Sequence, residues 1–267
     1  MYYMAHDGKP FAPYERTWLH EIFQRPIQFV LLQNVQLGHH SWFVVQRPYL
    51  TQYLDLFQRL EEARIPFHVL HLSDEFGNDP LFHSLSMCKS VIRNYPRSDI
   101  TEPHVHIIPL GYHHKYVGDK KKMSERELRW SFHGTDWFDR AKQLAEFTSF
   151  VPYRCNLQPH WNHPTKTRES VYLSQLGNSQ FCPILKGQHA ETFRFYEALE
   201  AGTLPVTNIT DEVWLAWIER EMGLSSLYPW KDVRGVMTSG VSEEVRVEVV
   251  RRWAAWKERV KGLLNKI

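Results

Sequence analysis

The stretch FCPILKGQHAETFRFYEALEAGTLPV, Phe181–Val206, contains two short apolar runs separated by a polar turn and a helical pattern. Thr192 stands where a side-chain oxygen can cap the start of that helix. Gly202 stands where a left-handed residue ends many helices. A strand, a helix and a second strand in this order are typical of a parallel sheet covered by helices. The stretch therefore predicts an α/β fold.

The same alternation runs through most of the chain. The segment Leu50–Ala63 repeats its apolar residues on one helical face. The segment 79–89 predicts a helix that Asp79 caps and Pro80 begins. The expected strands are 27–33, 65–72, 90–95, 104–110, 129–135, 180–185 and 203–207, and the other expected helices are 136–147, opened by Asp136, 167–176 and 191–201.

The pattern starts again after the charged stretch Gly118–Lys122. We therefore predict an N-terminal Rossmann-like domain over 1–117, a C-terminal Rossmann-like domain over 118–240, and a closing helix over 241–267 that bridges back. The apolar stripe of this helix consists of Val249, Trp253, Trp256, Val260 and Leu263. Two such domains that face each other hold their ligand in the cleft between them, beside the carboxyl ends of the strands.

Composition excludes several classes of protein. The net charge is +2, from 32 basic and 30 acidic residues, and a nucleic-acid-binding domain would show a concentrated basic excess. Three widely spaced cysteines give no disulfide framework. The N-terminus lacks a signal-peptide pattern, and no window holds the ~20 apolar residues of a membrane span. We expect a soluble, cytoplasmic protein without membrane insertion.

The turn and helix after the strand at 180–185 are suited to binding an anion. The N–H groups at a helix start attract a phosphate, and Arg194, in the first turn, can bind two of its oxygens. Lys186 and Gly187 would bring a cation and open backbone to the same anion. Glu197, one turn after Arg194, can accept hydrogen bonds from two ribose hydroxyls. The alternative is a plain strand–turn–helix in which Arg194 and Glu197 pair with each other.

A second group of candidates lies near the start of the C-terminal domain. Gly134 and Thr135 end the strand 129–135, and Arg140 lies on the following helix, so these three residues can meet a diphosphate. Arg154 ends another strand and can lie near a base. A tight turn with surface arginines explains the same residues equally well.

Metal binding is not predicted. The histidines come in close pairs such as His104 and His106, but no cysteine pair or HExxH pattern accompanies them. No Asp-x-Asp sequence, which would hold a metal-bound diphosphate, appears either. Dinucleotide-binding, phosphate-loop and nucleophile-elbow patterns are also missing from the sequence.

The stretch Phe181–Val206 resembles the signature of the exostosin-like glycosyltransferases. The matching positions are Lys186, Gly187, Thr192, Arg194, Glu197, Ala198, Gly202, Pro205 and Val206, and weaker similarity extends from about Phe67 onward. The resemblance implies a GT-B fold whose C-terminal domain holds a nucleotide sugar. The chain is short and shows no membrane anchor, which is unlike the Golgi members and would fit a microbial or large-virus system, such as the chlorella-virus type, in the host cytoplasm.

The resemblance also implies an activity. It predicts an inverting, metal-independent glycosyltransferase that moves a sugar from a UDP-sugar, with UDP-xylose as the best guess, to a hydroxyl of a glycan acceptor. Such a transfer needs a group that takes the acceptor's proton. Asp74 and Glu75, after the strand 65–72, and His40, after the first strand, are the candidates. Each carboxylate alone is also explained as a loop residue.

Two other functions fit the sequence. One is a non-catalytic carbohydrate- or nucleotide-binding module on the same fold, in which Arg194 and Glu197 bind and Asp74 is idle. The other is a nucleotide-dependent enzyme of another class, such as an epimerase. Release of UDP from a UDP-sugar without an acceptor distinguishes the transferase from the binding module.

Overall fold

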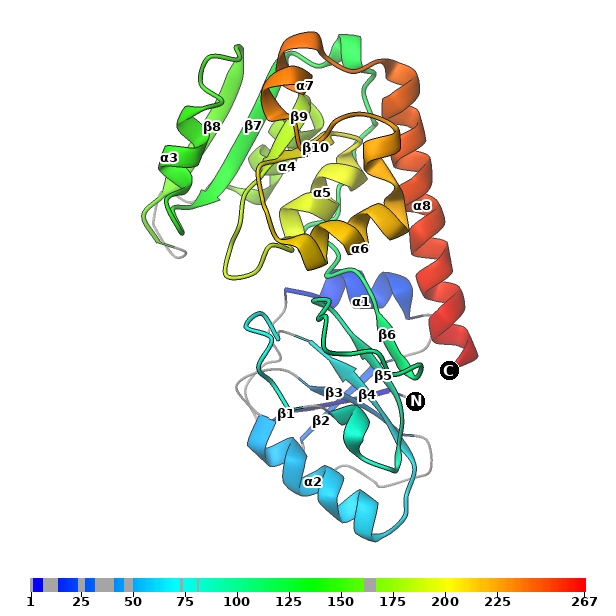
Figure 1. The fold of residues 1–267 in the computed structure, drawn as a ribbon. Coiled ribbons are helices and arrows are strands. Elements are labelled where there is room, and N and C mark those ends of the chain that lie inside the picture. Colours follow the sequence, from blue (N-terminus) through cyan, green and yellow to red (C-terminus); the bar gives the residue numbers. More distant parts are fainter. Residues whose placement is uncertain are drawn as a thin grey trace. The chain divides into compact units, whose positions relative to one another are not determined.

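The computed structural model describes residues 2–6, 14–23, 27–31, 41–45, 50–72, 74–80, 82–160 and 167–267. The chain divides into two compact units, Met1–Leu110 with Val260–Ile267, and Gly111–Arg259. Each unit is built on a parallel sheet flanked by helices (Figure 1). The predicted α/β class is therefore confirmed, and the two parallel sheets are compatible with two Rossmann-like domains.

The first unit contains a six-stranded sheet in the order β2-β1-β3-β4-β5-β6, with every pair parallel. Its strands are β1 Tyr2–His6, β2 Ile27–Leu31, β3 Ser41–Val45, β4 Phe67–His71, β5 Cys88–Arg93 and β6 Val105–Ile107, and its helices are α1 Arg16–Ile22 and α2 Leu50–Glu62. The strand order reverses between β1 and β3. The segments that follow these two strands, 7–13 and 46–49, lie outside the described residues.

The core of the first unit forms where α2 packs on β3 and β4. All five residues of β4 are buried, as expected for a central strand of a parallel sheet. The apolar face of α2 meets them: the rings of Phe57 and Phe67 are stacked with centroids 4.8 Å apart, and Phe43 meets Phe57 edge-on at 5.5 Å. The predicted periodicity of this helix is confirmed.

The helix predicted over 79–89 is wrong. This segment holds a short 3₁₀ turn at Phe82–Ser84, and β5 begins at Cys88. The carboxylate of Glu61 on α2 accepts hydrogen bonds from the backbone amides of Ser86 and Met87. Those amides are therefore satisfied by a distant side chain, so the local preference for a helix is overridden.

The second unit contains a four-stranded parallel sheet in the order β10-β9-β7-β8. Its strands are β7 Leu128–Thr135, β8 Tyr153–Gln158, β9 Ser179–Ile184 and β10 Leu204–Thr207. Its helices are α3 Arg140–Ala145, α4 Glu169–Gly177, α5 Phe193–Ala201, α6 Glu212–Met222, α7 Val233–Ser239 and the part of the long α8 Glu243–Lys266 that precedes Val260 (Figure 1). The chain moves from β7 to one side for β8 and to the other side for β9. The switch point of this sheet therefore lies between β7 and β9.

Two predicted helix caps are corrected. The α3 helix begins at Arg140 after a left-handed Asp139, whereas Asp136, the predicted cap, accepts a hydrogen bond from Ala141 N at 3.1 Å. Thr192 does occupy the position before α5, but its hydroxyl makes no capping hydrogen bond. In contrast, Gly202 ends α5 with φ of 65°, as predicted.

The α8 helix buries the apolar stripe that its sequence predicts, with one change. Val249, Trp253, Trp256 and Val260 are buried, but Leu264 rather than Leu263 completes the stripe. The helical repeat explains this difference, because a residue four positions after Val260 lies closer to the same face than one three positions after it. No described helix combines the length and the apolar character that a membrane span requires.

The α8 helix packs on α5 within the second unit. Glu200 of α5 is buried, and its carboxylate accepts hydrogen bonds from Trp253 Nε1 at 2.6 Å and Lys257 Nζ at 2.5 Å. The ring of Tyr196 lies 5.4 Å from that of Trp253. The α5 helix, which carries Arg194 and Glu197, is therefore fixed on the side away from its sheet.

Gly202→Ala is expected to destabilise the second unit by about 1–2 kcal/mol, the cost of left-handed backbone for a residue with a Cβ. The new Cβ would also lie 2.8 Å from Arg246 Nη1. Gly262→Ala, inside α8, is the matched control, because its Cβ would meet nothing within 4 Å and should stabilise by about 0.5–1 kcal/mol. Urea unfolding measures both. Similar shifts for the two variants would contradict the role of the left-handed end.

Candidate functional site

The carboxyl ends of β7 and β9 form the candidate site. Open α/β sheets bind ligands outside the ends of the strands that flank the switch point. The strand β7 ends in His133-Gly134-Thr135, and β9 leads into the turn that contains Lys186 and Gly187. The sheet therefore brings both predicted anion-binding segments to one edge.

Arg194 of α5, the helix that follows β9, extends across the switch point to β7. Its guanidinium carbon lies 4.1 Å from the centre of the Phe132 ring, and Nη2 donates a hydrogen bond to the His133 carbonyl oxygen. A Cβ on Gly134 would come within 2.7 Å of Nη2. Glycine at this position therefore makes room for the guanidinium.

Arg140 extends in the opposite direction, from the helix after β7 to the end of β9. It leaves α3, the helix that follows β7, and donates from Nε to the Lys186 carbonyl oxygen at 3.0 Å and from Nη2 to that of Leu185 at 3.4 Å. Its Nη1 donates to the Thr135 carbonyl oxygen at 3.0 Å. Arg140 is buried, and burial, together with the nearby positive charge of Arg194, lowers its pKa to about 9.

These two residues, the arginine pair, carry charge that no carboxylate binds directly. Among the described residues, neither guanidinium forms an ion pair, although Asp136 raises the pKa of Arg140 at longer range. The Nε atom of Arg194 and the hydroxyl of Thr192 are buried and have no hydrogen-bond partner among those residues. Buried charge is costly unless it is paired. The site therefore favours an oxyanion at the N-terminus of α5.

Glu197 lies one turn after Arg194 but does not pair with it. Its Oε1 accepts a hydrogen bond from the His114 backbone amide at 3.0 Å, and Oε2 accepts one from the Tyr172 hydroxyl at 2.5 Å. Burial, then the charge of Glu197, raises the pKa of Tyr172 well above 10, so Tyr172 stays a donor. The alternative in which Arg194 and Glu197 pair is therefore wrong.

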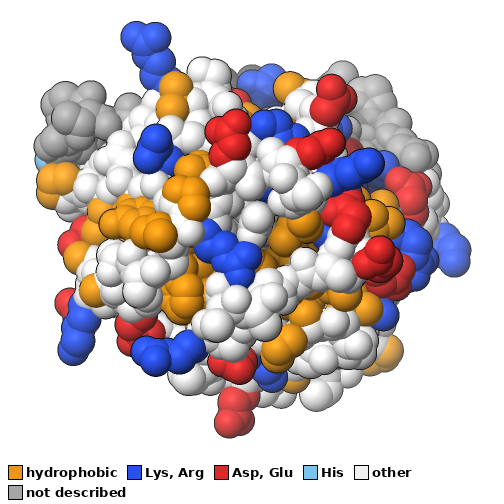
Figure 2. All heavy atoms as spheres, turned by 90° about the horizontal axis from the view of Figure 1, so that it is seen from above, with side chains coloured by type: hydrophobic (Ala, Val, Ile, Leu, Met, Phe, Trp, Pro, Cys, Tyr) orange, Lys and Arg blue, Asp and Glu red, His pale blue; other side chains and the backbone are white. Residues whose placement is uncertain are grey.

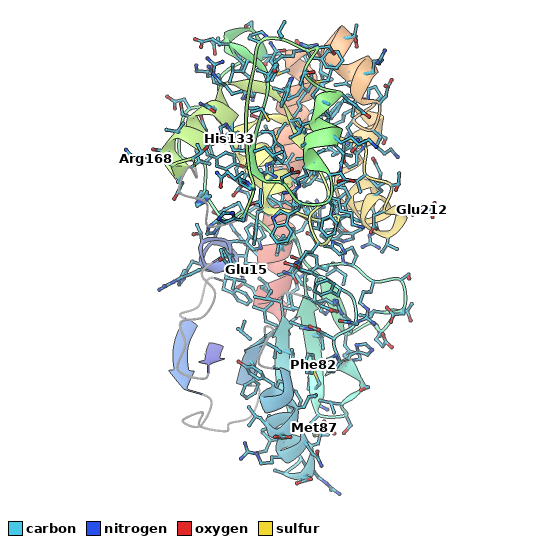
Figure 3. All side chains as sticks on the ribbon, turned by 90° about the vertical axis from the view of Figure 1, so that its left-hand side faces the viewer. Glu15, Phe82, Met87, His133, Arg168 and Glu212 are labelled. Atoms are coloured by element: carbon cyan, nitrogen blue, oxygen red, sulfur yellow. The ribbon has the colours of Figure 1, made fainter. Side chains whose placement is uncertain are left out.

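His133 adds a neutral polar group at the end of β7 (Figure 3). Its Nδ1 lies 3.0 Å from the Thr167 hydroxyl, and Nε2 is buried without a partner among the described residues. Burial lowers the pKa of His133 to about 4, so the ring is uncharged near neutral pH. No sequence pattern singles out His133 or Tyr172 as a site residue, and their positions beside Gly134 and Glu197 in space reveal them.

The other residues predicted to bind the nucleotide differ in how close they lie to the arginine pair. Thr135 is buried and contributes its carbonyl oxygen, and a Cβ on Gly187 would lie 3.4 Å from Arg140 Nη2. The side chain of Lys186 is exposed, while its carbonyl oxygen accepts from Arg140. Arg154 is exposed on β8, and the hydrogen bond described for it goes to the carbonyl oxygen of Tyr153. No described contact brings Arg154 to the other members of the site.

In the first unit, Asp74 is buried in a network of donors. Its Oδ1 accepts from the backbone amides of Asn78 and Asp79, at 3.0 and 3.1 Å. Its Oδ2 accepts from Arg93 Nη2 at 2.7 Å and Arg97 Nη1 at 3.2 Å. A carboxylate has about four lone-pair positions, and four donors fill them. This arrangement is that of a carboxylate that holds a loop, and it leaves no position for the proton of an acceptor hydroxyl.

Glu75 and His40 are the other two predicted proton acceptors. Glu75 is half-buried, and its Oε1 lies 3.4 Å from the Tyr95 hydroxyl. His40 lies outside the described residues. Arg93, the last residue of β5, is bound to Asp74.

One group in the described part of the chain has ligand atoms close enough for a metal ion. Atoms of His71, Asp74 and Asp79 all lie within 4.8 Å of one another. Arg93 and Arg97 already neutralise Asp74, and His71 Nε2 lies 2.9 Å from Asp79 Oδ2. A cation there would face two guanidinium groups, so these residues do not fit a metal site.

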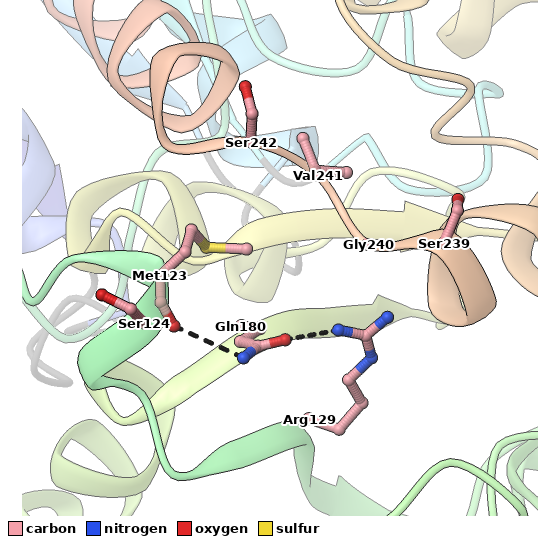
Figure 4. A pocket seen from close by; sticks show the side chains of 8 residues that line it. All are labelled: Met123, Ser124, Arg129, Gln180, Ser239, Gly240, Val241 and Ser242. Atoms are coloured by element: carbon pink, nitrogen blue, oxygen red, sulfur yellow. Dashed lines mark hydrogen bonds between the residues drawn. The ribbon is translucent and has the colours of Figure 1, made fainter.

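A hollow of about 420 Å³ lies at the opposite edge of the second sheet (Figure 4). It is lined by Met123, Ser124, Arg129, Gln180, Ser239, Gly240, Val241 and Ser242. Arg129 and Gln180 come from the first residues of β7 and β9, so the hollow is at their amino ends. The guanidinium of Arg129 is bound to Gln180 Oε1 and to the Met237 carbonyl oxygen near the end of α7. The polar side chains of Arg129 and Gln180 in this hollow therefore stabilise the fold.

Surface charge does not indicate a polyanion partner. On the face in Figure 2, basic and acidic side chains are interspersed with apolar ones, in agreement with the net charge of +2. No protein-family model matches the chain, and no curated protein is similar to it in sequence. The site geometry therefore carries the functional argument.

Asp74→Asn is expected to destabilise the first unit by about 3–5 kcal/mol, because it leaves the charge of Arg93 buried without a partner. Asp99→Asn is the control: Asp99 pairs with the same Arg97 but is exposed, so its loss should cost about 1 kcal/mol or less. Denaturant unfolding of both variants tests this structural role. An Asp74→Asn protein as stable as the wild type would contradict it.

Proposed function

We propose that the protein is an inverting glycosyltransferase whose second unit binds the diphosphate of a UDP-sugar. The arginine pair carries this proposal: two guanidinium groups that have no carboxylate partner in the described part of the chain lie at the switch point of the sheet and beside the start of α5. Arginine binds phosphate oxygens in a fork geometry. The GT-B arrangement of the two units, and the exostosin-like family, belong to the same proposal.

Glu197 supports a nucleotide rather than a free phosphate. Two donors occupy two of its roughly four acceptor positions, so the others can accept from ribose hydroxyls. Because Glu197 and Arg194 are one turn apart on α5, a diphosphate at Arg194 places the attached ribose near Glu197. Gly134, Thr135, Gly187 and Thr192 shape the same edge of the sheet, and Lys186 and Arg154 are proposed as outer contacts.

Transfer with inversion needs a proton acceptor. The four donors on Asp74 make Glu75 and His40 the better candidates. The donor sugar is proposed to be xylose and the acceptor a glycan hydroxyl, in the cytoplasm of the cell that makes the protein. No resident cofactor is required, because the UDP-sugar is itself a substrate.

A non-catalytic nucleotide- or carbohydrate-binding module is the second candidate. The saturated environment of Asp74 favours it, because this strand-end carboxylate is bound as a structural group. The two candidates differ in one observable. A transferase releases UDP slowly from its donor without acceptor, whereas a binding module releases none.

Arg194→Ala is expected to raise the Kd for UDP by about 10²-fold or more, since charge-assisted hydrogen bonds to phosphate are lost. Arg194→Lys should also bind weakly, because an ammonium does not reproduce the fork. Arg251→Ala is the control, since Arg251 is exposed on α8 and pairs with Glu248. Titration calorimetry gives the Kd, and circular dichroism checks folding. Unchanged affinity in a folded Arg194→Ala protein would remove the site from consideration.

UDP release from a panel of UDP-sugars should occur without a divalent ion. The arginine pair and the helix N-terminus can stabilise the leaving diphosphate, a role that Mg²⁺ has in other enzymes. We expect one donor, UDP-xylose first, to be hydrolysed at the same rate with and without EDTA. Loss of release in EDTA with recovery on adding Mn²⁺ would overturn the metal-independent mechanism. No release from any donor would favour the binding module.

A further inference from the structure

An exposed pair of aromatic residues lies on the loop that joins β7 to α3. The side chains of Trp137 and Phe138 are 40% and 58% exposed, although rings of this size usually contribute their area to a core or an interface. They stand between Thr135, the last residue of β7, and Arg140, the first residue of α3. The proposed function does not use them.

This loop is joined directly to the arginine pair. The carbonyl oxygen of Thr135 accepts two hydrogen bonds, one from the backbone amide of Trp137 and one from Arg140 Nη1, each at 3.0 Å. The Arg140 amide in turn donates to the Trp137 carbonyl oxygen at 3.2 Å. The backbone of Trp137 and the guanidinium of Arg140 thus meet at one oxygen atom, and a phosphate on the arginine pair lies beside the aromatic pair.

The loop holds an unusual backbone conformation. Phe138 and Asp139 have φ of 50° and 59°, and a bulky residue such as phenylalanine rarely adopts positive φ. The conformation is held by Gln143, whose Nε2 donates to the Phe138 carbonyl oxygen and whose amide donates to that of Asp139, both at 3.0 Å. Such conformations are concentrated at ligand clamps. The rings are therefore presented from a hydrogen-bonded backbone.

We propose that Trp137 and Phe138 form a stacking platform for the base of the nucleotide whose phosphates bind at the arginine pair. This inference rests on the proposed function, because it takes the arginine pair as the phosphate site. A base offers a planar π face that stacks on aromatic side chains whatever its hydrogen-bonding pattern.

The surroundings of the pair favour a small planar ligand. Asp136 and Asp139, on either side of the two rings, are exposed and acidic. The apolar surface of this loop therefore consists of two rings, and its area is far smaller than the area that a stable protein interface buries. A base attached to a phosphate on Arg140 has the size and the position to cover it.

Titration calorimetry with UDP and with pyrophosphate tests the platform. Trp137→Leu and Phe138→Leu keep apolar side chains but remove the aromatic face. In each variant, the Kd for UDP is expected to rise about 5- to 150-fold, the range for loss of one base–aromatic stack. The Kd for pyrophosphate should stay as in the wild type. Phe76→Leu is the matched control, because Phe76 is an equally exposed aromatic residue, at 60%, in the first unit.

The other outcomes separate this inference from the proposed function. Unchanged UDP affinity in both variants would overturn the platform and leave the phosphate site standing. Equal weakening of UDP and pyrophosphate would also overturn it, because the rings would then act only by supporting the loop of Arg140. Weaker binding of xylose 1-phosphate with unchanged UDP would assign the rings to the sugar instead. A wild-type protein that binds neither UDP nor pyrophosphate would refute the phosphate site itself.

Discussion

The carboxyl edge of the second unit's sheet depends on Arg140 and Arg194, whose side chains extend in opposite directions between β7 and β9. Each arginine lies on the helix that follows one strand, and its guanidinium donates to backbone carbonyl oxygen at the end of the other strand. Carbonyl oxygens accept from all three nitrogens of the Arg140 guanidinium and from Nη2 of Arg194, whereas Arg194 Nε has no partner among the described residues, and no carbonyl neutralises the charge. The fold therefore keeps β7 and β9 together with two guanidinium charges that are at least partly buried, and an anion that bound there would offset the cost of burying them.

The first unit has the same residue types near its strand ends, but there the arginines are paired with carboxylates. Arg93 and Arg97 also lie near strand ends, but Asp74 pairs with both of them, and Asp99 pairs with Arg97 as well. In the sequence, Asp74 and Arg194 look alike, since each is a charged residue shortly after an apolar strand. The two differ in their ion-pair partners: Arg194 has none among the described residues, whereas those of Asp74 are 19 and 23 residues away along the chain. Spacing along the chain cannot supply that information.

The sequence predicted the elements that depend on local pattern. The strands β4, β7 and β9 and the helices α2, α5 and α8 follow from periodicity, and the end of α5 follows from Gly202. The pattern failed where a distant side chain satisfies the backbone, as Glu61 does for the segment before β5. It also assigned Thr192 a capping hydrogen bond, whereas its hydroxyl is unpartnered beside Arg194. The strands β1 and β3 and the exposed pair Trp137 and Phe138 had no pattern long enough to identify them.

The position of Arg194 is fixed by constraints along the whole of α5. Glu197 is bound by Tyr172 and by the His114 amide, and Glu200 by Trp253 and Lys257 of α8. At the C-terminal end, Arg126 donates to the Ala201 carbonyl oxygen at 3.0 Å. A helix anchored at three levels cannot rotate without breaking these contacts, so the guanidinium is held at the end of β7. Groups that are already in place lose little entropy when they bind charge, which is the condition under which a few hydrogen bonds select one ligand.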